Sequence, residues 1–342
     1  MTYPDGTSDE VEVPVTVTKT ESPSPNYPLP GGNSSTDNNS SDGNSSTNSN
    51  GRISGNDRVD TAIRFSQQNY TQSDKVIVVD SGNYPDALTA SVLAKVLKCP
   101  ILLNNKNYLE ESVKAEIQRL KVKDVIVVGG RNSISNEVKD ALKQFDNDGV
   151  ERIAGADRYK TSVEVAKRIV KISGNSNKVV IASGETFPDA LSVSPFAGKI
   201  NAPILLVRQN VMDVEVRNYL NEMAIQEVYI TGGTRTISSN LESQISNVRL
   251  RFDGSNRYET AVKIAKYSFK SSKHAYIVSG EVFPDALVVG AVAAQQNSPI
   301  LLTSKNTTKE TKEYLNNSSI TDVTIVGGLN TVKDSARKDY TN

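Results

Sequence analysis

Residues 76–103 read VIVVDSGNYPDALTASVLAKVLKCPILL, and this stretch decides the fold class. Its first four residues form a short apolar run rich in β-branched side chains, as in a strand that is covered on both faces. Residues 87–97 are apolar at helical spacing, and residues 101–103 form a second short apolar run. A strand, a helix and a strand in this order predict a parallel sheet with right-handed crossovers.

The same pattern continues beyond this stretch. Residues 109–120 are amphipathic at helical spacing, and residues 125–128 read VIVV, a third short apolar run. Strands and helices therefore alternate through a unit of roughly 90–100 residues, which is long enough to enclose a hydrophobic core of its own. We expect each such unit to be a small three-layer α/β domain.

The unit occurs three times along the chain. It opens on RISGNDR at residues 52–58, RIAGADR at 152–158 and RFDGSNR at 251–257. In each copy there follow SGNYPDAL, SGETFPDAL or SGEVFPDAL, from residues 81, 183 and 279, then PILL, and finally an apolar run that closes on Gly-Gly. Four motifs in the same order three times are not a chance pattern, and they indicate internal repeats.

The part of the chain before the repeats has a different composition. Of residues 33–50, 13 of 18 are Ser or Asn and none is aliphatic or aromatic, so they cannot bury enough apolar surface to fold. Residues 11–17 carry Val at every second position, interrupted by Pro14, which predicts one β-hairpin remnant. The predicted domains are a short β segment at 1–19, a Pro-rich and then Ser/Asn-rich disordered linker at 20–51, and repeats at 52–150, 151–249 and 250–342.

The neutral total charge is the sum of two parts with opposite net charges. Residues 1–51 contain one base and seven acids, for a net charge of −6, and residues 52–342 contain 38 bases and 32 acids, for +6. A basic surface attracts anions over long distances. With only 6% aromatic residues, no Trp and no nucleic-acid-binding motif, we expect no nucleic acid as partner.

The composition also excludes most hydrolytic zinc centres, and the chain has no apolar run long enough to span a membrane. A lone Cys99 cannot form an intrachain disulfide or a cysteine-based zinc site, and a lone His274 excludes zinc centres with two histidines, so we expect no catalytic residues and no metal. The longest nearly unbroken apolar run, residues 286–294, is far shorter than the ~20 residues that span a bilayer. Residues 1–5 do not resemble a signal peptide.

The Gly-Gly pairs are candidate turns. They could bring backbone N–H groups close to a phosphate, but they lack both the full dinucleotide fingerprint and the lysine of a P-loop. We interpret them as tight exits from the third strand with a positive φ angle, and we expect no cofactor. The pairs are Gly129 and Gly130, Gly232 and Gly233, and Gly327 and Gly328.

The Pro-Asp-Ala-Leu motif stands where a strand ends and a helix begins. Pro is favoured in the first turn of a helix, and an Asp beside it can accept hydrogen bonds from free N–H groups and complement the helix dipole. Paired acid/base catalysis would need a second carboxylate in register, and the first copy has Asn83 at that place. We therefore interpret Asp86, Asp189 and Asp285 as helix caps.

The arginine motif at the start of each repeat is the strongest functional signal. Two arginines six residues apart flank a Gly turn, and Asp57 and Asp157 could each hold one of them in a salt bridge, whereas the third copy has Asn256 there. The arginines could tie one repeat to its neighbour, or their planar guanidinium groups could bind phosphate or carboxylate. The two interpretations are compatible, with one arginine structural and the other exposed. The candidate residues are Arg52, Arg58, Arg152, Arg158, Arg251 and Arg257.

The four motifs together resemble the clostridial-type cell-wall-binding repeat 2, which occurs as three tandem copies. The resemblance covers residues 52–342. It implies Toprim-like α/β modules in a pseudo-threefold ring. It also implies non-covalent anchoring of a surface protein, at the cell wall or cell surface, to an anionic wall polymer such as a teichoic-acid-like polysaccharide. Residues 2–18 resemble the closing strands of Rib-type repeats of Gram-positive surface adhesins. Most of such a repeat and a signal peptide are missing from the sequence, so we expect a secreted protein of which this chain is either a fragment or a version that starts at a misplaced Met1.

The sequence departs from the repeat pattern in two places. Val59 stands where the other copies have Tyr159 and Tyr258, so the arginine loop of the first copy is expected to pack differently. The third copy lacks the strand that follows the first and second copies. Its sheet is therefore either incomplete or borrows an edge strand from the first copy.

The sequence leaves three functional hypotheses. The leading one is a non-catalytic wall-anchoring module that binds the anionic polymer through its arginines. The second is an adhesion or interaction module whose partners are other surface proteins. The third is a fragment of a wall-lytic amidase, which the single histidine and the short segment before the repeats argue against.

Overall fold

The computed structural model describes residues 51–174 and 177–341. The predicted β segment at 1–19 and all but the last residue of the predicted linker at 20–51 lie outside the described residues. The described part contains three four-stranded sheets, and every pairing between strands is parallel. The prediction of an α/β fold with three parallel-sheet units is therefore confirmed.

The first repeat shows the order of elements that the apolar runs predict. Its strands are β2 (Lys75–Asp80), β3 (Ile101–Asn104) and β4 (Asp124–Val128). Its helices are α1 (Arg58–Asn69), α2 (Pro85–Leu97), α3 (Glu111–Leu120), α4 (Asn136–Leu142) and the 3-10 helix η1 (Lys143–Phe145). Strands β2 and β4 are buried from their second residue onward, because helices cover both faces of the sheet.

The second and third repeats have the same order. In the second repeat the strands are β5 (Glu151–Ile153), β6 (Lys178–Ser183), β7 (Ile204–Val207), β8 (Glu227–Thr231) and β9 (Val248–Phe252), and the helices are α5 (Arg158–Ser173), α6 (Pro188–Lys199), α7 (Val214–Glu222) and α8 (Ser239–Glu242). In the third repeat the strands are β10 (His274–Ser279), β11 (Ile300–Thr303) and β12 (Asp322–Val326), and the helices are α9 (Arg257–Ser268), η2 (Pro284–Ala286), α10 (Val289–Gln295), α11 (Lys309–Asn316) and α12 (Asp334–Thr341).

The helix of the Pro-Asp-Ala-Leu motif differs in the third repeat. In the first two repeats α2 and α6 begin at the Pro of the motif and are continuous, but in the third the motif forms η2, and α10 begins only at Val289. The sequence after the motif is VVG, with two β-branched residues followed by Gly290. These residue types lower the propensity for an α-helix, which accounts for the later start.

Each sheet takes its fourth strand from across a repeat boundary. The strand orders are β3-β2-β4-β5, β7-β6-β8-β9 and β1-β12-β10-β11, where β1 is Arg52–Ile53. Strand β5 begins just after the predicted boundary at residue 150, yet it pairs with β4 of the repeat before it. The strand that carries the first arginine of each motif therefore closes the sheet of the preceding copy.

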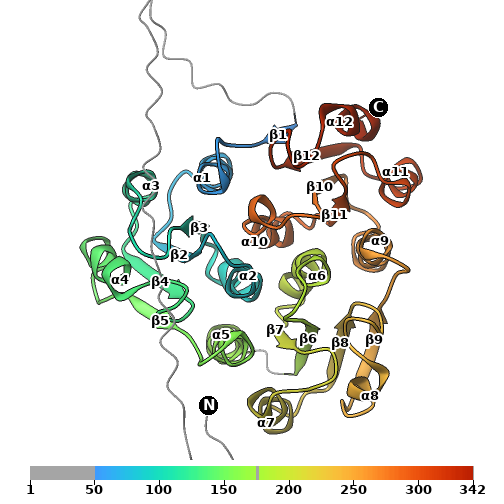
Figure 1. Ribbon diagram of the computed structural model, residues 1–342, viewed down its shortest axis with the longest axis horizontal. Coiled ribbons are helices and arrows are strands. Elements are labelled where there is room, and N and C mark those ends of the chain that lie inside the picture. Colours follow the sequence, from blue (N-terminus) through green and yellow to red (C-terminus); the bar gives the residue numbers. More distant parts are fainter. Residues whose placement is uncertain (1–50, 175–176, 342) are drawn as a thin grey trace, which may run out of the picture. The chain divides into compact units, whose positions relative to one another are not determined.

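The third sheet is completed by β1 from the start of the repeat segment. Arg52 pairs with Ile325 and Ile53 pairs with Val326, in parallel. This confirms that the third copy borrows an edge strand, and the alternative of an incomplete sheet is wrong. The three repeats are therefore linked in a closed cycle by main-chain hydrogen bonds. In Figure 1, β1 (blue) lies beside β12 (red), although nearly the whole repeat segment separates them along the chain.

The helices α2, α6 and α10, which follow β2, β6 and β10, pack against one another in the middle of the repeats (Figure 1). Helices α2, α6 and α10 contact each other in pairs, and their side chains belong to one continuous hydrophobic cluster. At Gly290 a Cβ atom would lie 2.3 Å from the Ser194 hydroxyl oxygen, so α10 approaches α6 closely only because residue 290 is glycine.

Candidate functional site

The first arginine of each motif lies on a strand and is held by the backbone of the neighbouring Gly-Gly turn. We call Arg52, Arg152 and Arg251 the strand arginines. Their Nη1 atoms donate to the carbonyl oxygens of Gly327 at 2.6 Å, Gly129 at 2.7 Å and Gly232 at 2.7 Å, respectively. Each bond joins the strand to the first glycine of the turn beside it, so the three arginines have the same role in all three sheets.

Further hydrogen bonds fix each strand arginine in place. The Nη2 atom of Arg52 donates to the Val332 carbonyl at 2.9 Å, and that of Arg152 donates to the Ser135 carbonyl at 3.1 Å. Arg251 instead forms an ion pair with Glu242 at 2.9 Å. The side chains of Arg52 and Arg251 are only 11% and 10% exposed, so little of either guanidinium group is left for a ligand.

The Gly-Gly turns have the backbone conformation that the sequence predicts. The first glycine of each pair has a positive φ angle, +121° at Gly129, +105° at Gly232 and +128° at Gly327. This is the left-handed half of conformational space, which side chains other than glycine rarely adopt. The carbonyl of that same glycine then accepts the hydrogen bond of the strand arginine.

The second arginine of each motif begins a helix. We call Arg58, Arg158 and Arg257, the first residues of α1, α5 and α9, the loop arginines. Arg58 donates to the Ser81 carbonyl at 2.8 Å and Arg158 to the Gly184 carbonyl at 2.7 Å, and Arg257 donates to the Gly280 carbonyl. Arg58 and Arg257 are exposed and Arg158 is half-buried, so the loop arginines keep donors available at the surface.

Among the described residues, Asp57 and Asp157 do not form the salt bridges with the motif arginines that the sequence allows. Asp57 and Asp157 are the N-cap residues of α1 and α5, and their carboxylates accept hydrogen bonds from backbone N–H groups of the first turn. Asn256 caps α9 in the same way, from Tyr258 and Glu259 at 3.0 Å. An Asn side chain can replace Asp at a cap because the acceptor is one side-chain oxygen, which explains the third copy without any ion pair.

The arginine loop of the first copy packs differently, as its Val59 predicts. In the other two copies a Cβ on Gly184 or Gly280 would lie 2.6 Å from a ring carbon of Tyr159 or 3.1 Å from a ring carbon of Tyr258. The ring thus covers the glycine to which the loop arginine is bonded. In the first copy no tyrosine ring is present at this place, and the loop arginine donates one residue earlier, to Ser81.

The Asp of each Pro-Asp-Ala-Leu motif lies in the first helical turn but is not the cap that we expected. The N-cap residues of α2, α6 and η2 are Tyr84, Phe187 and Phe283, and none of them makes a side-chain cap hydrogen bond. The Asp side chain reaches the Gly-Gly turn instead. A Cβ on Gly129 or Gly232 would lie 2.6 Å from Oδ2 of Asp86 or Asp189, so only glycine leaves room for the carboxylate.

Burial raises the pKa of all three carboxyl groups. Asp86 and Asp189 are each 7% exposed. Burial raises the pKa of Asp86, while a hydrogen bond from the Ser133 hydroxyl at 2.8 Å lowers it. The pKa of Asp189 is raised to about 6, again by burial, and the positive charge of Arg257 lowers it. For Asp285 the raising effect of burial is opposed by hydrogen bonds from Thr61 and the Gly328 N–H.

Two clefts lie where consecutive repeats meet, each built from one of these carboxylates, a Gly-Gly turn and a loop arginine. Cleft 1, between repeats 1 and 2, has a volume of about 430 Å³ and is lined by Asp86, the turn at 130–133 and the loop at 155–158. Cleft 2, between repeats 2 and 3, has a volume of about 460 Å³ and is lined by Asp189, the turn at 233–236 and the loop at 253–257.

The same groups meet at the junction between repeats 3 and 1. Asp285 is close enough to Thr61 and Gly328 to form hydrogen bonds with them, and the charge of Arg58 lowers its pKa. The loop arginine of the first copy is thereby combined with the carboxylate and the turn of the third copy. This junction depends on β1, because β1 carries the start of the first arginine motif onto the third sheet.

The arginines in the loops after the Gly-Gly pairs were not predicted from the sequence. Arg131 lines cleft 1 and Arg235 lines cleft 2, and both side chains are exposed. They occupy neighbouring but not equivalent positions, one and two residues after the pair, so a comparison of the repeats does not align them. The third copy has Leu329, which is 56% exposed, at the position of Arg131.

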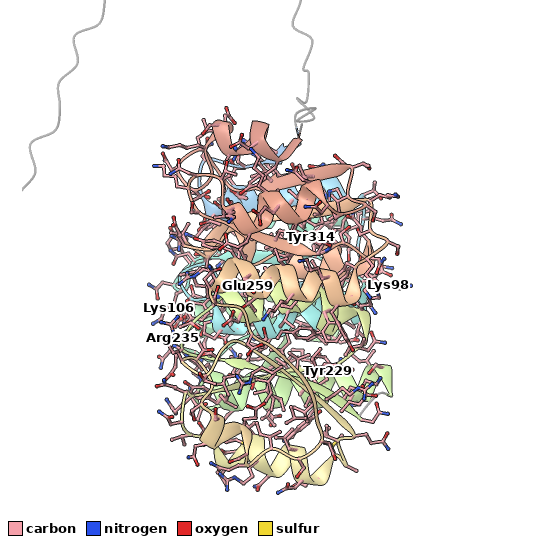
Figure 2. All side chains as sticks on the ribbon, turned by 90° about the vertical axis from the view of Figure 1, so that its right-hand side faces the viewer. Lys98, Lys106, Tyr229, Arg235, Glu259 and Tyr314 are labelled. Carbon is pink, nitrogen blue, oxygen red and sulfur yellow. The ribbon has the colours of Figure 1, made fainter. Side chains whose placement is uncertain are left out.

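The clefts open on the side of the repeats where the parallel strands end. Figure 2 shows Arg235, which follows β8, on the same side as Lys106, which follows β3. Lys98, which precedes β3, lies on the opposite side. Ligands of open parallel sheets bind at the carboxyl ends of the strands, so the clefts have the usual location of a binding site in this class of fold.

The lone cysteine and histidine have structural surroundings. Cys99 is fully buried, and burial raises the pKa of its thiol to about 12. His274, at the start of β10, lies 3.2 Å from the Ser298 hydroxyl and 2.9 Å from the Thr324 hydroxyl through its two ring nitrogens. Within residues 51–174 and 177–341 no three His, Cys, Asp or Glu side chains are arranged to hold a metal ion. No helix in the described part is long and apolar enough to cross a membrane.

A larger hollow lies away from the clefts. It has a volume of about 660 Å³ and is lined by side chains of α9, α11 and the loop after α11. Its charged residues have both signs, with Glu259, Glu310 and Glu313 facing Lys266 and Lys270. The hollow has no counterpart in the repeated motifs, so the clefts remain the candidate site.

Comparison with known proteins links all three repeats to one family. The family model described as Cell wall binding domain 2 (CWB2) matches residues 52–139, 152–242 and 251–337. The N-acetylmuramoyl-L-alanine amidase LytC of Bacillus subtilis (strain 168) is 28% identical over 292 residues, which are 85% of this chain and 58% of that protein. The amidase enhancer of the same organism is 29% identical over 258 residues, 75% of this chain and 35% of that protein.

Solved structures share the fold. Cwp6 from Clostridium difficile has a TM-score of 0.78 and 31% sequence identity, covering 85% of this chain and 48% of that one. Cwp8 from Clostridium difficile has a TM-score of 0.75 and 27% identity, covering 84% of this chain and 50% of that one. The chain thus spans well under two thirds of the length of each of these relatives.

Proposed function

The chain belongs to the Cell wall binding domain 2 family, with three tandem copies, and from this premise we propose that it anchors a surface protein to a Gram-positive cell wall by binding an anionic wall polysaccharide. The family binds cell-wall polymers and has its place at the cell wall or cell surface. That this chain is secreted, and that its polymer is anionic and teichoic-acid-like, are parts of the proposal. The binding is non-covalent and non-catalytic.

The proposal is supported above all by the two clefts between repeats. Each combines two arginines with a glycine turn, Arg131 and Arg158 in cleft 1 and Arg235 and Arg257 in cleft 2. Guanidinium groups bind phosphate and carboxylate through paired hydrogen bonds. The loop arginines, which have donors at the surface, are the ligand-binding members of the six candidates, and the strand arginines are structural.

Repetition of the site strengthens a weak contact. An arginine at the surface binds one phosphate weakly, because water and salt screen the charge. A polymer with many anionic groups can occupy several clefts at once, and each further contact is then intramolecular. The net charge of +6 on residues 52–342 attracts such a polymer over a longer distance.

The proposal is tested by sedimentation with purified cell walls. The full chain is mixed with intact walls and with walls stripped of their anionic polymer, across a series of salt concentrations. We expect binding to intact walls that weakens as salt increases, and little binding to stripped walls. Undiminished sedimentation with stripped walls would show that the anionic polymer is not the ligand.

Matched variants separate the two sets of arginines in this assay. Changing Arg58, Arg158 and Arg257 together to Gln removes one positive charge from each cleft and one from the junction between repeats 3 and 1. We expect it to abolish most wall binding while circular dichroism and the unfolding midpoint remain near those of the wild type. A variant that unfolds, rather than one that is folded and fails to bind, would assign the loop arginines a structural role instead.

Two control experiments test the two alternative functions. Binding to surface proteins in the absence of wall material would favour the interaction module. The amidase name belongs to a relative of which this chain covers 58%, and we propose no lytic activity for residues 52–342. A zymogram with wall material in the gel should show no clearing, and a clear band would contradict a purely binding function.

We also propose the finer description of the fold. The repeats are Toprim-like and related by a pseudo-threefold axis that runs between α2, α6 and α10. Support comes from the pairwise packing of these helices and from the rings of Tyr84, Phe187 and Phe283, whose centroids lie 5.3–6.0 Å apart at the start of the three motifs. A Rib-like identity of residues 1–19 remains a proposal about residues outside the described part.

A further inference from the structure

The carboxylates of the three motifs differ in their hydrogen bonds. Asp86 in cleft 1 accepts a hydrogen bond from the Ser133 hydroxyl at 2.8 Å. At the third junction, interactions with Thr61 and the Gly328 N–H lower the pKa of Asp285 against the raising effect of burial. The carboxylate of Asp189 in cleft 2 accepts none from any described residue, although its side chain is as buried as that of Asp86. Thr236, which occupies the place of Ser133, donates to the Gly233 carbonyl at 2.9 Å instead.

Asp189 is 7% exposed, and its carboxylate oxygens are not among the described buried atoms that lack a hydrogen bond, so they reach solvent where the residue lines cleft 2. An acceptor in a cleft binds water, and a ligand hydroxyl can replace that water. Desolvation is the first cause of the raised pKa of Asp189, and among charged groups only Arg257 opposes it. The residue lines cleft 2 together with Arg235 and Arg257, and with the exposed Asp253, which is paired with Lys263 at 3.7 Å. A hydrogen-bond donor supplied by a ligand would satisfy Asp189.

We propose that cleft 2 binds a sugar phosphate or polyol phosphate, with a ligand hydroxyl donating to Asp189 and the phosphate bound by Arg257 and Arg235. The inference rests on the proposed function and adds a specificity-determining residue to it. Arg257 has free donors, because its one hydrogen bond among the described residues goes to the Gly280 carbonyl. A cleft of about 460 Å³ has room for a single sugar ring with its phosphate.

Cleft 1 has the same architecture but not the same preference. Its arginines can bind a phosphate, but the carboxylate of Asp86 is already occupied by Ser133. Two similar clefts on one chain therefore differ in whether they recognise a hydroxyl group beside the anion. The difference depends on the rotamer and identity of one residue after the Gly-Gly turn, Ser133 or Thr236.

The test compares two probes at both clefts of the full chain. Glucose 6-phosphate and inorganic phosphate are titrated separately and followed by NMR. The amide signals of Gly233 and Thr234 report on cleft 2, and those of Gly130 and Arg131 report on cleft 1. We expect glucose 6-phosphate to bind cleft 2 about three- to tenfold more tightly than phosphate, the value of one hydrogen bond. At cleft 1 the two probes should bind equally within about twofold.

Three variants assign the preference to the hydrogen bond. Asp189→Ala should abolish the preference at cleft 2, and Thr236→Ser should reduce it by giving Asp189 the internal donor that Asp86 has. Ser133→Ala removes the internal donor at cleft 1 and should create the preference there. Asp86→Ala is the matched control and should leave cleft 2 unchanged. The dispersion of the amide spectrum shows in each case whether the variant is folded.

Equal binding of the two probes at cleft 2 would overturn the inference, and so would a preference that survives Asp189→Ala. A cleft 2 that responds to neither probe would overturn it as well. None of these results affects wall sedimentation by the unchanged chain, which decides the proposed function separately. A chain that binds walls but shows no sugar preference at cleft 2 keeps the proposed function without its specificity residue.

Discussion

The two arginines of each motif stand six residues apart and have opposite surroundings. The strand arginine lies beside a Gly-Gly turn and donates to backbone carbonyls, and the side chains of Arg52 and Arg251 are largely buried. The loop arginine begins a helix and donates to a backbone carbonyl too, but it borders a cleft. The same residue type therefore stabilises the fold in one place and, in the proposed function, binds the ligand in the other. The two differ in the number of hydrogen bonds that the arginine makes to the protein.

Replacing a strand arginine should have the largest effect on stability. Arg251→Ala removes the hydrogen bond to Gly232 and leaves Glu242 without its partner. We expect a loss of ~2–4 kcal/mol in the free energy of unfolding, because the bonds are charge-assisted and partly buried. Urea denaturation measures it. Arg235→Ala, an exposed control, should stay within ~0.5 kcal/mol of the wild type, and an equal loss in both variants would erase the distinction.

The charged carboxylate of Asp189 should lower the free energy of unfolding at neutral pH. The pKa of Asp189 in the folded protein is about 6, above the ordinary 3.8, so the folded state holds the proton more tightly than the unfolded state. Stability therefore falls as pH rises from about 4 to 6. Asp189→Asn removes this dependence, and above pH 6 the variant should be more stable than the wild type by ~1–3 kcal/mol.

The measurement for Asp189→Asn is the unfolding midpoint in urea between pH 4 and pH 8. Asp86→Asn is the matched control, and its gain should be smaller, because the hydrogen bond from Ser133 already compensates part of the burial. A variant that is less stable than the wild type at pH 7 would mean that Arg257 stabilises the charged carboxylate more strongly than burial opposes it.

Replacing a single loop arginine should affect binding more than stability. Arg257→Gln leaves the helix cap of Asn256 intact and removes one positive charge from cleft 2. We expect wall binding to weaken about three- to tenfold and the free energy of unfolding to fall by no more than ~1 kcal/mol. Quantitative sedimentation and urea denaturation on the same preparation compare the two. A large loss of stability without loss of binding would place this arginine with the strand arginines.

The smallest effect should come from adding an arginine where the third copy has none. Leu329 is exposed at the position of Arg131, so Leu329→Arg adds a charge at the junction between repeats 3 and 1. We expect wall affinity to rise about twofold, with a steeper dependence on salt and a stability change within ~0.5 kcal/mol. Leu329→Gln is the uncharged control, and an equal gain from it would exclude a charge effect.

Local patterns predicted much of this molecule. The apolar runs around residues 76–128 predicted three strands and two helices in the right order, and helix 87–97 was found at Pro85–Leu97. The glycine turns were predicted because a strand that ends on Gly-Gly needs a positive φ angle, and Gly129 has +121°. The repeated motifs indicated the family, which the match to all three copies confirms.

The candidate site was predicted only in part, because its members come from different copies. The arginine motif was recognised, but a salt bridge was the role considered for Asp57 and Asp157, which cap helices instead. Asp86 and its counterparts were assigned to caps when they face glycine turns. Residues such as Arg131 and Arg235 were missed, since their positions differ between copies and no local pattern marks the edge of a cleft.

The repeats, the α/β class and the turn chemistry follow from local sequence, because each depends on residues within one strand, helix or turn. Only the tertiary structure decided three other features. It placed β1 in the third sheet, it separated the buried arginines from the available ones, and it left Asp189 without a hydrogen bond from another described residue. Arg52 pairs with Ile325 across almost the whole repeat segment. Whether an arginine or a carboxylate is satisfied depends on which neighbour from another repeat supplies the hydrogen bond, and that neighbour is fixed only when the repeats pack.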